Sequence, residues 1–284
     1  MSAELTARYE KERPVVVGYH GRPDSRAALV WAAGEADRRR VPLLVVNAAD
    51  YPGMTLGPGR GLLDPSPRGL EADEELTARG VAEALAVRPG LRVSGMTVPT
   101  APVSTLAELA GAASVLVLGS RGHGRLRTAL RRSVVCEVTA RTRCPVVVVR
   151  SGRERPDGEV VVAHDGSPEP LGFAADHAAA TSGRLLVVTA TGEGAADQVL
   201  RAASNLAEEG RDAVAGTHPD LTVVTAVEPG SAERALVSAS MKARLVVVGT
   251  RDREVLLGSR CPVAVVQPST APSSFARTSA MSAR

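Results

Sequence analysis

Three glycines follow a run of apolar residues in the sequence GSRGHG, which spans residues 119–124. Glycine lets backbone N–H groups come close to a ligand, and the start of a following helix adds a dipole that favours negative charge. The chemistry that such a loop supports is phosphate binding, to which Ser133 adds a hydroxyl donor. Glycine also serves in strand-to-helix turns because it tolerates positive φ, so the loop alone leaves a purely structural role open.

Other phosphate-binding and catalytic motifs are absent. The lysines, Lys11 and Lys242, follow Glu10 and Met241, whereas a phosphate loop of the form G-x-x-x-x-G-K-[ST] needs a lysine directly after glycine. Residues 18–21 read GYHG, which is neither the S-G-G-x-D-S of an ATP pyrophosphatase nor the G-x-G-x-x-G of a dinucleotide oxidoreductase. No nucleophile–base or carboxylate pair stands out, so we expect a protein that is not an enzyme, slow ATP hydrolysis aside.

Metal and redox chemistry find little support in the sequence. The cysteines, Cys136, Cys144 and Cys261, are too few and too scattered for a disulfide framework or a C-x-x-C metal site. The five histidines show no H-E-x-x-H spacing. Cys144 and Cys261 each precede a proline at the start of an apolar run, where a small buried residue fits, and a redox role would require a lowered thiol pKa.

Composition narrows the range of partners. The 284 residues are 44% hydrophobic and 23% charged, which is typical of a globular protein. Aromatic residues make up only 2%, too few to stack the bases of single-stranded nucleic acid. A net charge of +3 gives no general attraction to nucleic acid or membranes. Residues 1–13 are charged and lack an apolar stretch, and no run of about 18 apolar residues occurs in the sequence. We therefore expect a cytoplasmic protein with neither nucleic-acid nor membrane partners.

The sequence contains two copies of one pattern. Three similar segments recur in the same order. VVVGYHGRP at residues 15–23 matches VVVAHDGSP at 160–168, VLVLGSR at 115–121 matches LVVVGTR at 245–251, and CPVVVV at 144–149 matches CPVAVV at 261–266. The offsets fall from 145 to 130 to 117, so the second copy is shorter in two places. A repeat of this length indicates two tandem domains.

Each copy alternates strand-like and helix-like segments. In the first copy we predict strands at 15–17, 43–47, 91–98, 115–118 and 145–149, with helices at 24–40, 71–87, 104–112 and 127–141. In the second copy we predict strands at 159–163, 184–190, 221–227, 244–249 and 262–267, with helices between the first four. Such alternation gives parallel pairing through right-handed crossovers, which is a doubly wound α/β domain. The predicted domains span 13–151 and 158–268, followed by a disordered tail at 269–284.

Ligands in open α/β sheets bind at the carboxyl ends of the strands, where the strand order reverses. The loops after the first and fourth strands are therefore the candidate positions. In the first copy, a strand is followed by G-x-x-G, nine residues and a pair that resembles G-[ST], and then by a helix and CPVVVV. This order resembles the signature of the universal stress protein family, and the resemblance covers both copies. It implies five-stranded sheets of order 3-2-1-4-5, and the residue offsets indicate that the second domain is shortened. Many members of that family bind ATP, and others have lost the ability.

The resemblance assigns phosphate contacts to the first copy. Gly119 and Gly122 match the leading glycines that hold phosphates through backbone amides, with Gly124 in the same loop, and Ser133 matches the terminal hydroxyl residue. Arg132 stands where the family has a third glycine. Its side chain either blocks close approach of the backbone or pairs with phosphate through the guanidinium group, and both alternatives stay open.

The nucleoside end is less well matched. The aspartate that the family places after the first strand falls on His20, close to Gly18, and a histidine cannot accept hydrogen bonds as a carboxylate does. Ala48 matches a position that reads adenine through its backbone, which makes few demands on the side chain. On this resemblance we expect ATP, accompanied by Mg²⁺, as the cofactor of the first domain.

The second copy lacks room for the same loop. Eleven residues separate Gly249 from Cys261, against twenty-four between the equivalent residues of the first copy. A glycine loop, nine further residues and a full helix cannot fit, so we expect no phosphate cradle there, and Gly258-Ser259 is at most a remnant. Asp165 has the residue type that the family uses, but D-G-S-P is good turn chemistry, so we expect a turn or capping role.

Two functions follow from these observations. The first is a stress-response or regulatory protein that binds an adenine nucleotide in its first domain, and the alternative is a nucleotide-silent tandem scaffold that acts through contacts with unknown protein partners. The final strands, Val146–Val149 and Val263–Val266, are apolar edges that would be risky if exposed. Pairing them within one chain gives a pseudo-twofold monomer, and a homodimer remains the other option.

Overall fold

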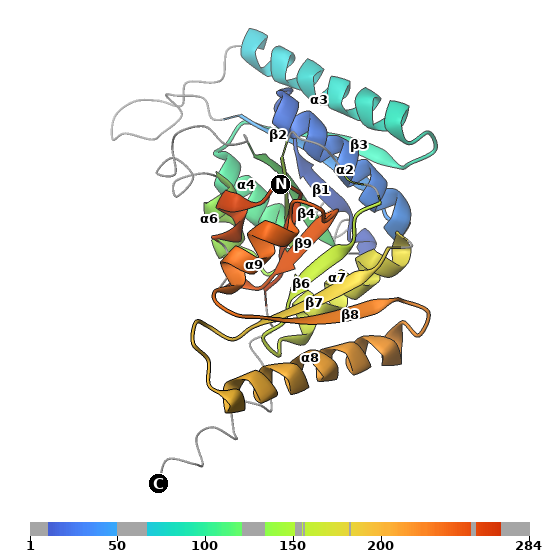
Figure 1. The fold of residues 1–284 in the computed structure, drawn as a ribbon. Helices are drawn as coiled ribbons and strands as arrows, with labels where there is room; N and C mark the ends of the chain where they lie inside the picture. Colours follow the sequence, from blue (N-terminus) through green and yellow to red (C-terminus); the bar gives the residue numbers. More distant parts are fainter. Residues whose placement is uncertain are drawn as a thin grey trace, which may run out of the picture. The chain divides into compact units, whose positions relative to one another are not determined.

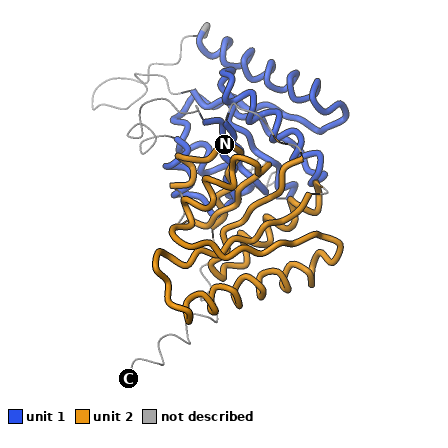
Figure 2. The backbone as a smooth tube through the Cα atoms, viewed as in Figure 1, with its two compact units in different colours: residues 1–151 blue, residues 152–284 orange. Residues whose placement is uncertain are grey.

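The computed structural model describes residues 11–49, 67–120, 134–150, 155, 157–181, 183–250 and 254–267. The chain divides into two compact units, residues 1–151 and 152–284 (Figure 2). The predicted tail at 269–284, and Gly122, Gly124, Arg132 and Ser133 of the predicted phosphate loop, lie outside the described residues.

Unit 1 alternates strands and helices along the chain (Figure 1). The elements are β1 (Val15–Gly18), α2 (Pro23–Arg39), β2 (Leu43–Ala48), α3 (Pro67–Val87), β3 (Val93–Val98), α4 (Pro102–Ala110), β4 (Val115–Ser120), α6 (Val134–Arg141) and β5 (Val146–Arg150). All the described pairings are parallel, and the strand order is β3-β2-β1-β4-β5, as predicted. Helices α2 and α3 contact each other, as do α4 and α6. Right-handed crossovers place these two pairs on opposite faces of the sheet.

The central strands of unit 1 are buried on both faces. The three valines of β1, Val15–Val17, are at most 1% exposed. Apolar runs without alternation are typical of parallel strands that are covered by helices on both sides. The core is aliphatic, as the shortage of aromatic residues predicts.

Unit 2 repeats the arrangement with a shorter final crossover. Its elements are β6 (Val160–Ala163), α7 (Pro168–Ala180), β7 (Leu185–Ala190), α8 (Asp197–Thr217), β8 (Val223–Glu228), α9 (Ala232–Ala239), β9 (Leu245–Val248), α10 (Val255–Gly258) and β10 (Val263–Val265). The strand order is β10-β9-β6-β7-β8, which is again 3-2-1-4-5 when read from β8. Helix α10 is a single turn of four residues, which fits the expected lack of room for a full helix.

One boundary differs from the sequence prediction in a way that matters for the site. The fourth strand was expected to end at residue 118, with Gly119 beginning the loop. In the structure Gly119 and Ser120 belong to β4 and lie opposite Val149 and Arg150 of β5. The prediction was wrong because β5 continues to Arg150 and therefore offers ladder partners to two further residues. Among the described residues, no helix is long and apolar enough to cross a membrane.

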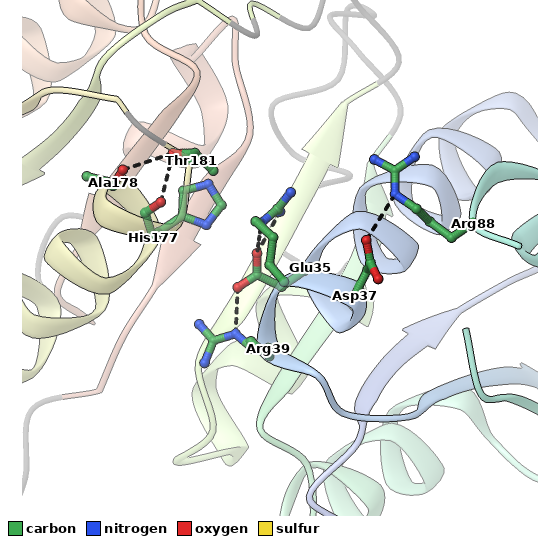
Figure 3. A network of polar contacts seen from close by, with 8 residues as sticks. Glu35, Asp37, Arg39, Arg88, His177, Ala178 and Thr181 are labelled. Atoms are coloured by element: carbon green, nitrogen blue, oxygen red, sulfur yellow. Dashed lines mark hydrogen bonds and ion pairs between the residues drawn. The ribbon is translucent and has the colours of Figure 1, made fainter. Parts of the chain in front are cut away.

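Helix α2 has an acidic residue in its first turn and arginines in its last turn. Close to its C-terminus, the buried carboxylate of Glu35 accepts hydrogen bonds from Arg38 Nη2 at 2.7 Å and from Arg39 Nε at 2.6 Å (Figure 3). Arginines in the last turn also interact favourably with the helix dipole. Asp24 occupies the first turn at the other end. Because α2 runs antiparallel to the strands, Asp24 lies at the carboxyl edge of the sheet and the Glu35 cluster lies at the amino edge.

Candidate functional site

The reversal of strand order in unit 1 falls between β1 and β4. These strands are neighbours, and the chain continues from β1 to β2 on one side and from β4 to β5 on the other. Gly18 ends β1, Ala48 ends β2, and Gly119 is the penultimate residue of β4. The structure therefore brings three of the predicted site residues to one edge of the sheet, with His20 in the turn that follows β1.

Gly119 lies directly against the start of α2. A Cβ atom at this position would come within 2.5 Å of the carbonyl carbon and oxygen of Asp24, and within 2.7 Å of the Ser25 nitrogen. These are backbone atoms of a helix and cannot move aside as a flexible side chain does. The fold alone therefore requires glycine at this position, whatever ligand the edge binds.

Gly18 also has a packing role. Its Cβ would lie 3.0 Å from Leu118 Cδ2 and 3.7 Å from Leu106 Cδ1, on the face of the sheet that α4 covers. In the turn that follows, Gly21 has φ of +74°, and the equivalent Gly166 of unit 2 has φ of +94°. Both turns thus use the left-handed region that glycine adopts without strain.

His20 and Asp24 form a pair at this edge. The His20 Nε2 atom lies 3.6 Å from Asp24 Oδ2, and the side chains are 47% and 8% exposed. The His20 backbone N–H donates to Ser25 Oγ at 3.3 Å, so the turn is tied to the first turn of α2. The structure thus places a carboxylate beside the histidine that stands in the family's aspartate position. Sequence reasoning missed Asp24, although the i,i+4 spacing at a helix start was the available signal.

A closed polar network lies beside this edge, between the sheet and α3. The Asn47 amide donates to the Asp73 carboxylate at 3.1 Å and to the Asp73 carbonyl at 3.3 Å. Thr77 Oγ1 lies 2.9 Å from the same carbonyl, to which it donates, and 2.7 Å from Thr97 Oγ1. The buried side chains of Asn47 and Thr77 are both hydrogen-bonded, so the network fixes α3 on β2 and β3.

The ring of Tyr19, which follows β1, also packs between the sheet and α3. A Cβ on Gly80 of α3 would come within 2.8 Å of this ring, so the close contact depends on glycine. The Tyr19 hydroxyl donates to Glu83 Oε2 at 3.1 Å, and Arg26 Nη2 donates to Glu83 Oε1 at 2.7 Å. Burial is the main cause that raises the pKa of Tyr19, so the hydroxyl stays protonated and continues to donate.

Unit 2 uses its corresponding residues for structure. Asp165 Oδ1 accepts a hydrogen bond from the Ser167 backbone N–H at 3.1 Å, which confirms the expected turn role. Gly258 ends α10, and its Cβ would come within 2.7 Å of Val237 on α9. The buried Ser259 hydroxyl donates to the Val255 carbonyl at 2.9 Å. The remnant of the glycine motif is thus part of the helical packing of this unit.

His164 occupies in unit 2 the position that Tyr19 holds in unit 1, and it faces Gly210 as Tyr19 faces Gly80. Burial lowers the pKa of His164 below its usual 6.5, against the opposing charges of Asp165 and Glu209. Below pH 6.5 the unfolded chain therefore binds a proton that the folded unit resists, and stability is lost as the pH falls. We expect His164→Phe to lose less stability than the wild type between pH 7.5 and 5.5, measured by the urea midpoint.

The matched control for that measurement is Tyr19→Phe. It removes a polar atom from the equivalent buried position of unit 1, but tyrosine does not titrate in this range. Its stability should follow the wild-type pH dependence. Equal losses in the wild type and in His164→Phe would contradict the assignment to His164.

The comparisons with known proteins agree with this fold. A model of the Universal stress protein family matches residues 12–150. Universal stress protein Rv2005c of Mycobacterium tuberculosis is 32% identical over 273 residues, which cover 87% of this chain and 90% of that protein. The crystal structure of a universal stress protein from Archaeoglobus fulgidus superimposes with a TM-score of 0.71 at 18% identity, and the match covers 92% of this chain and 98% of that one.

The structural match extends the agreement from sequence to fold, because both units contribute to a superposition that covers nearly the whole of each chain. The sequence match to the mycobacterial protein likewise runs through both units rather than through one of them. The chain belongs to the universal stress protein family.

Proposed function

We propose that unit 1 binds ATP, with Mg²⁺, at the carboxyl edge of β1 and β4, and that the protein is a cytoplasmic stress-response regulator rather than an enzyme. The observation that carries the proposal is that Gly18, Ala48 and Gly119 share the carboxyl edge of the sheet, beside the reversal of strand order between β1 and β4. This is where nucleotides bind in doubly wound sheets. The glycine loop that begins at Gly119 in the sequence supplies backbone N–H groups for phosphate.

The charges at the edge favour one orientation of the nucleotide. The Asp24 carboxylate occupies the first turn of α2, so this helix start is not available to an anion and the phosphates belong on the loop after β4. The half-exposed His20 ring and the Asp24 carboxylate then face the nucleoside end. In this arrangement Asp24 supports the acceptor role that His20 itself cannot fill.

Calorimetric titration of the purified full chain with ATP and Mg²⁺ tests the proposal. We expect measurable binding, and we expect Gly122→Val to weaken it at least about tenfold, which corresponds to about 1.4 kcal/mol, because a branched side chain blocks backbone approach. The control is Gly249→Val at the matching strand end of unit 2, where a Cβ meets no atom within 4 Å. Binding that survives Gly122→Val would overturn the site.

The absence of heat at millimolar ATP would favour the alternative function, a tandem scaffold that acts through protein contacts. The substitution of His20 for the family's aspartate and the presence of Arg132 are the features that point that way. The Arg132→Gly variant separates the two interpretations of that side chain. Tighter ATP binding means that Arg132 obstructs the loop, and weaker binding means that its guanidinium pairs with phosphate.

A further inference from the structure

The two units can be compared position by position beneath their longest helices. Helices α3 and α8 are both 21 residues long and are offset by 130 residues. Gly80 faces Tyr19 and Gly210 faces His164, so the helices contact their sheets in the same register. The polar network of unit 1 therefore has exact positional counterparts in unit 2.

Four buried positions beneath α8 carry smaller side chains than their counterparts beneath α3. Four positions that line the contact between sheet and helix change as follows: Tyr19 corresponds to His164, Asn47 to Thr189, Asp73 to Ala203, and Thr77 to Ala207. All four unit 2 residues are buried. Because alanine stands at Ala203 and Ala207 on α8, the side-chain groups of Asp73 and Thr77 that hydrogen-bond beneath α3 have no counterparts there.

Two buried polar atoms border this space. His164 Nδ1 and Thr189 Oγ1 are each inaccessible to solvent and have no hydrogen-bond partner within the described parts of the chain. The residues themselves are 8% and 4% exposed. Leaving a buried donor or acceptor unsatisfied is costly, so such atoms in native proteins call for an explanation.

The two atoms belong to neighbouring positions on one face of the sheet. Ala163 of β6 pairs with Val188 of β7, and the His164 N–H donates to the Val188 carbonyl at 2.9 Å, which continues the parallel ladder. His164 and Thr189 are thus lateral neighbours, about 4.8 Å apart along the hydrogen-bonding direction. The His164 ring faces α8, and Thr189 has the same orientation because Asn47, its counterpart, reaches α3.

The loops that follow β7 and β8 are joined to each other at this end of the sheet. Gly192 and Gly230 exchange two backbone hydrogen bonds of 3.0 Å, and Glu193 forms an ion pair with Arg234. The Thr191 N–H also donates to the Glu228 carbonyl at 3.1 Å. Because these contacts tie the two loops together and both polar atoms are inaccessible to solvent, we consider a small polar occupant rather than an extended ligand.

We propose that unit 2 binds one internal water molecule between β6, β7 and α8, held by His164 Nδ1 and Thr189 Oγ1. Water fits because it donates and accepts hydrogen bonds and is small enough for an enclosed polar site. An anion does not fit, because burial lowers the pKa of His164 and keeps the ring neutral. In unit 1 the side chains of Asn47 and Asp73 satisfy each other, so no water is needed there.

Thr189→Val distinguishes a hydrated site from a dry one, since the substitution preserves shape and removes only the hydroxyl. If water is bound, it loses a partner, and we expect the urea midpoint of the full chain to fall and hydrogen exchange of the β7 and α8 amides to accelerate roughly threefold to tenfold. If the site is dry, removal of an unsatisfied hydroxyl stabilises the unit and slows exchange. The control is Thr222→Val at an exposed position, where neither effect is expected.

A crystal structure of the full chain provides the direct test. We expect an electron-density peak about 2.7–3.2 Å from both His164 Nδ1 and Thr189 Oγ1. The double variant Thr189→Asn/Ala203→Asp transplants the unit 1 pair and should displace this peak. No peak in the wild type, or a Thr189→Val variant that is more stable than the wild type, would overturn the proposal.

Discussion

Alanine at Gly119 should destabilise unit 1 by about 3 kcal/mol, at the upper end of the cost of overpacking a core. The added Cβ would lie 2.5 Å from the carbonyl carbon and oxygen of Asp24, which is well inside van der Waals contact. Relief requires the first turn of α2 to move away from β4, which disturbs the His20 turn and the burial of α2 together. We expect a lower urea midpoint and loss of hydrogen-exchange protection in β1, β4 and α2.

Gly249→Ala is the matched control, because Gly249 follows β9 as Gly119 follows the apolar part of β4. A Cβ at Gly249 meets no atom within 4 Å, and its φ does not lie in the left-handed region. The substitution should leave stability unchanged or raise it by about 0.4–1 kcal/mol, since alanine restricts the unfolded chain. Similar midpoints for Gly119→Ala and Gly249→Ala would show that α2 yields without cost and would refute the packing argument.

The expected cost of Gly119→Ala bears on how the glycine motif of this chain is interpreted. The first glycine of the G-x-x-G sequence is required by the approach of α2 to β4, so its presence carries little information about phosphate. Loss of ATP binding in a Gly119 variant would have two causes that an affinity cannot separate. Gly122 is therefore the informative position for the ligand, and Gly119 is the informative position for the fold.

The sequence predicted the architecture because its signals are local and repeated. Unbroken valine runs such as Val15–Val17 indicate strands buried on both faces, and the second copy of each recurring segment confirmed the division into strands and helices. Even the shortened crossover before Cys261 followed from residue counts. These features depend on hydrophobic pattern and chain length, which the sequence displays directly.

The details of the candidate site were harder to predict because they depend on contacts between distant residues. Gly119 was interpreted as a phosphate ligand, and nothing in its neighbourhood in the sequence shows that the backbone of Asp24 lies against it. The unsatisfied atoms of His164 and Thr189 become visible only when β6, β7 and α8 are assembled.

Cys144 should be nearly inert to alkylation in the folded protein. Burial raises the pKa of its thiol to about 12 from an ordinary value of 9.0, and the weak opposing effects of Leu116, Arg13 and Arg39 do not offset this. Three pKa units reduce the reactive thiolate about a thousandfold at pH 8. We expect iodoacetamide at pH 8 to modify Cys144 at least about a thousandfold more slowly in the native protein than in urea.

Cys136 provides the internal control in the same experiment, since it is half-buried on α6 and a tryptic digest separates it from Cys144. Labelling of Cys144 then requires opening of β5, so its rate reports local unfolding.

The raised pKa of Cys144 also affects stability. Between pH 9 and 12 the Cys144 thiol has lost its proton in the unfolded chain but retains it in the folded chain, so stability should fall as the pH rises through this range. Native alkylation of Cys144 within tenfold of the unfolded rate would instead indicate an activated thiol and would restore the redox role that its burial argues against.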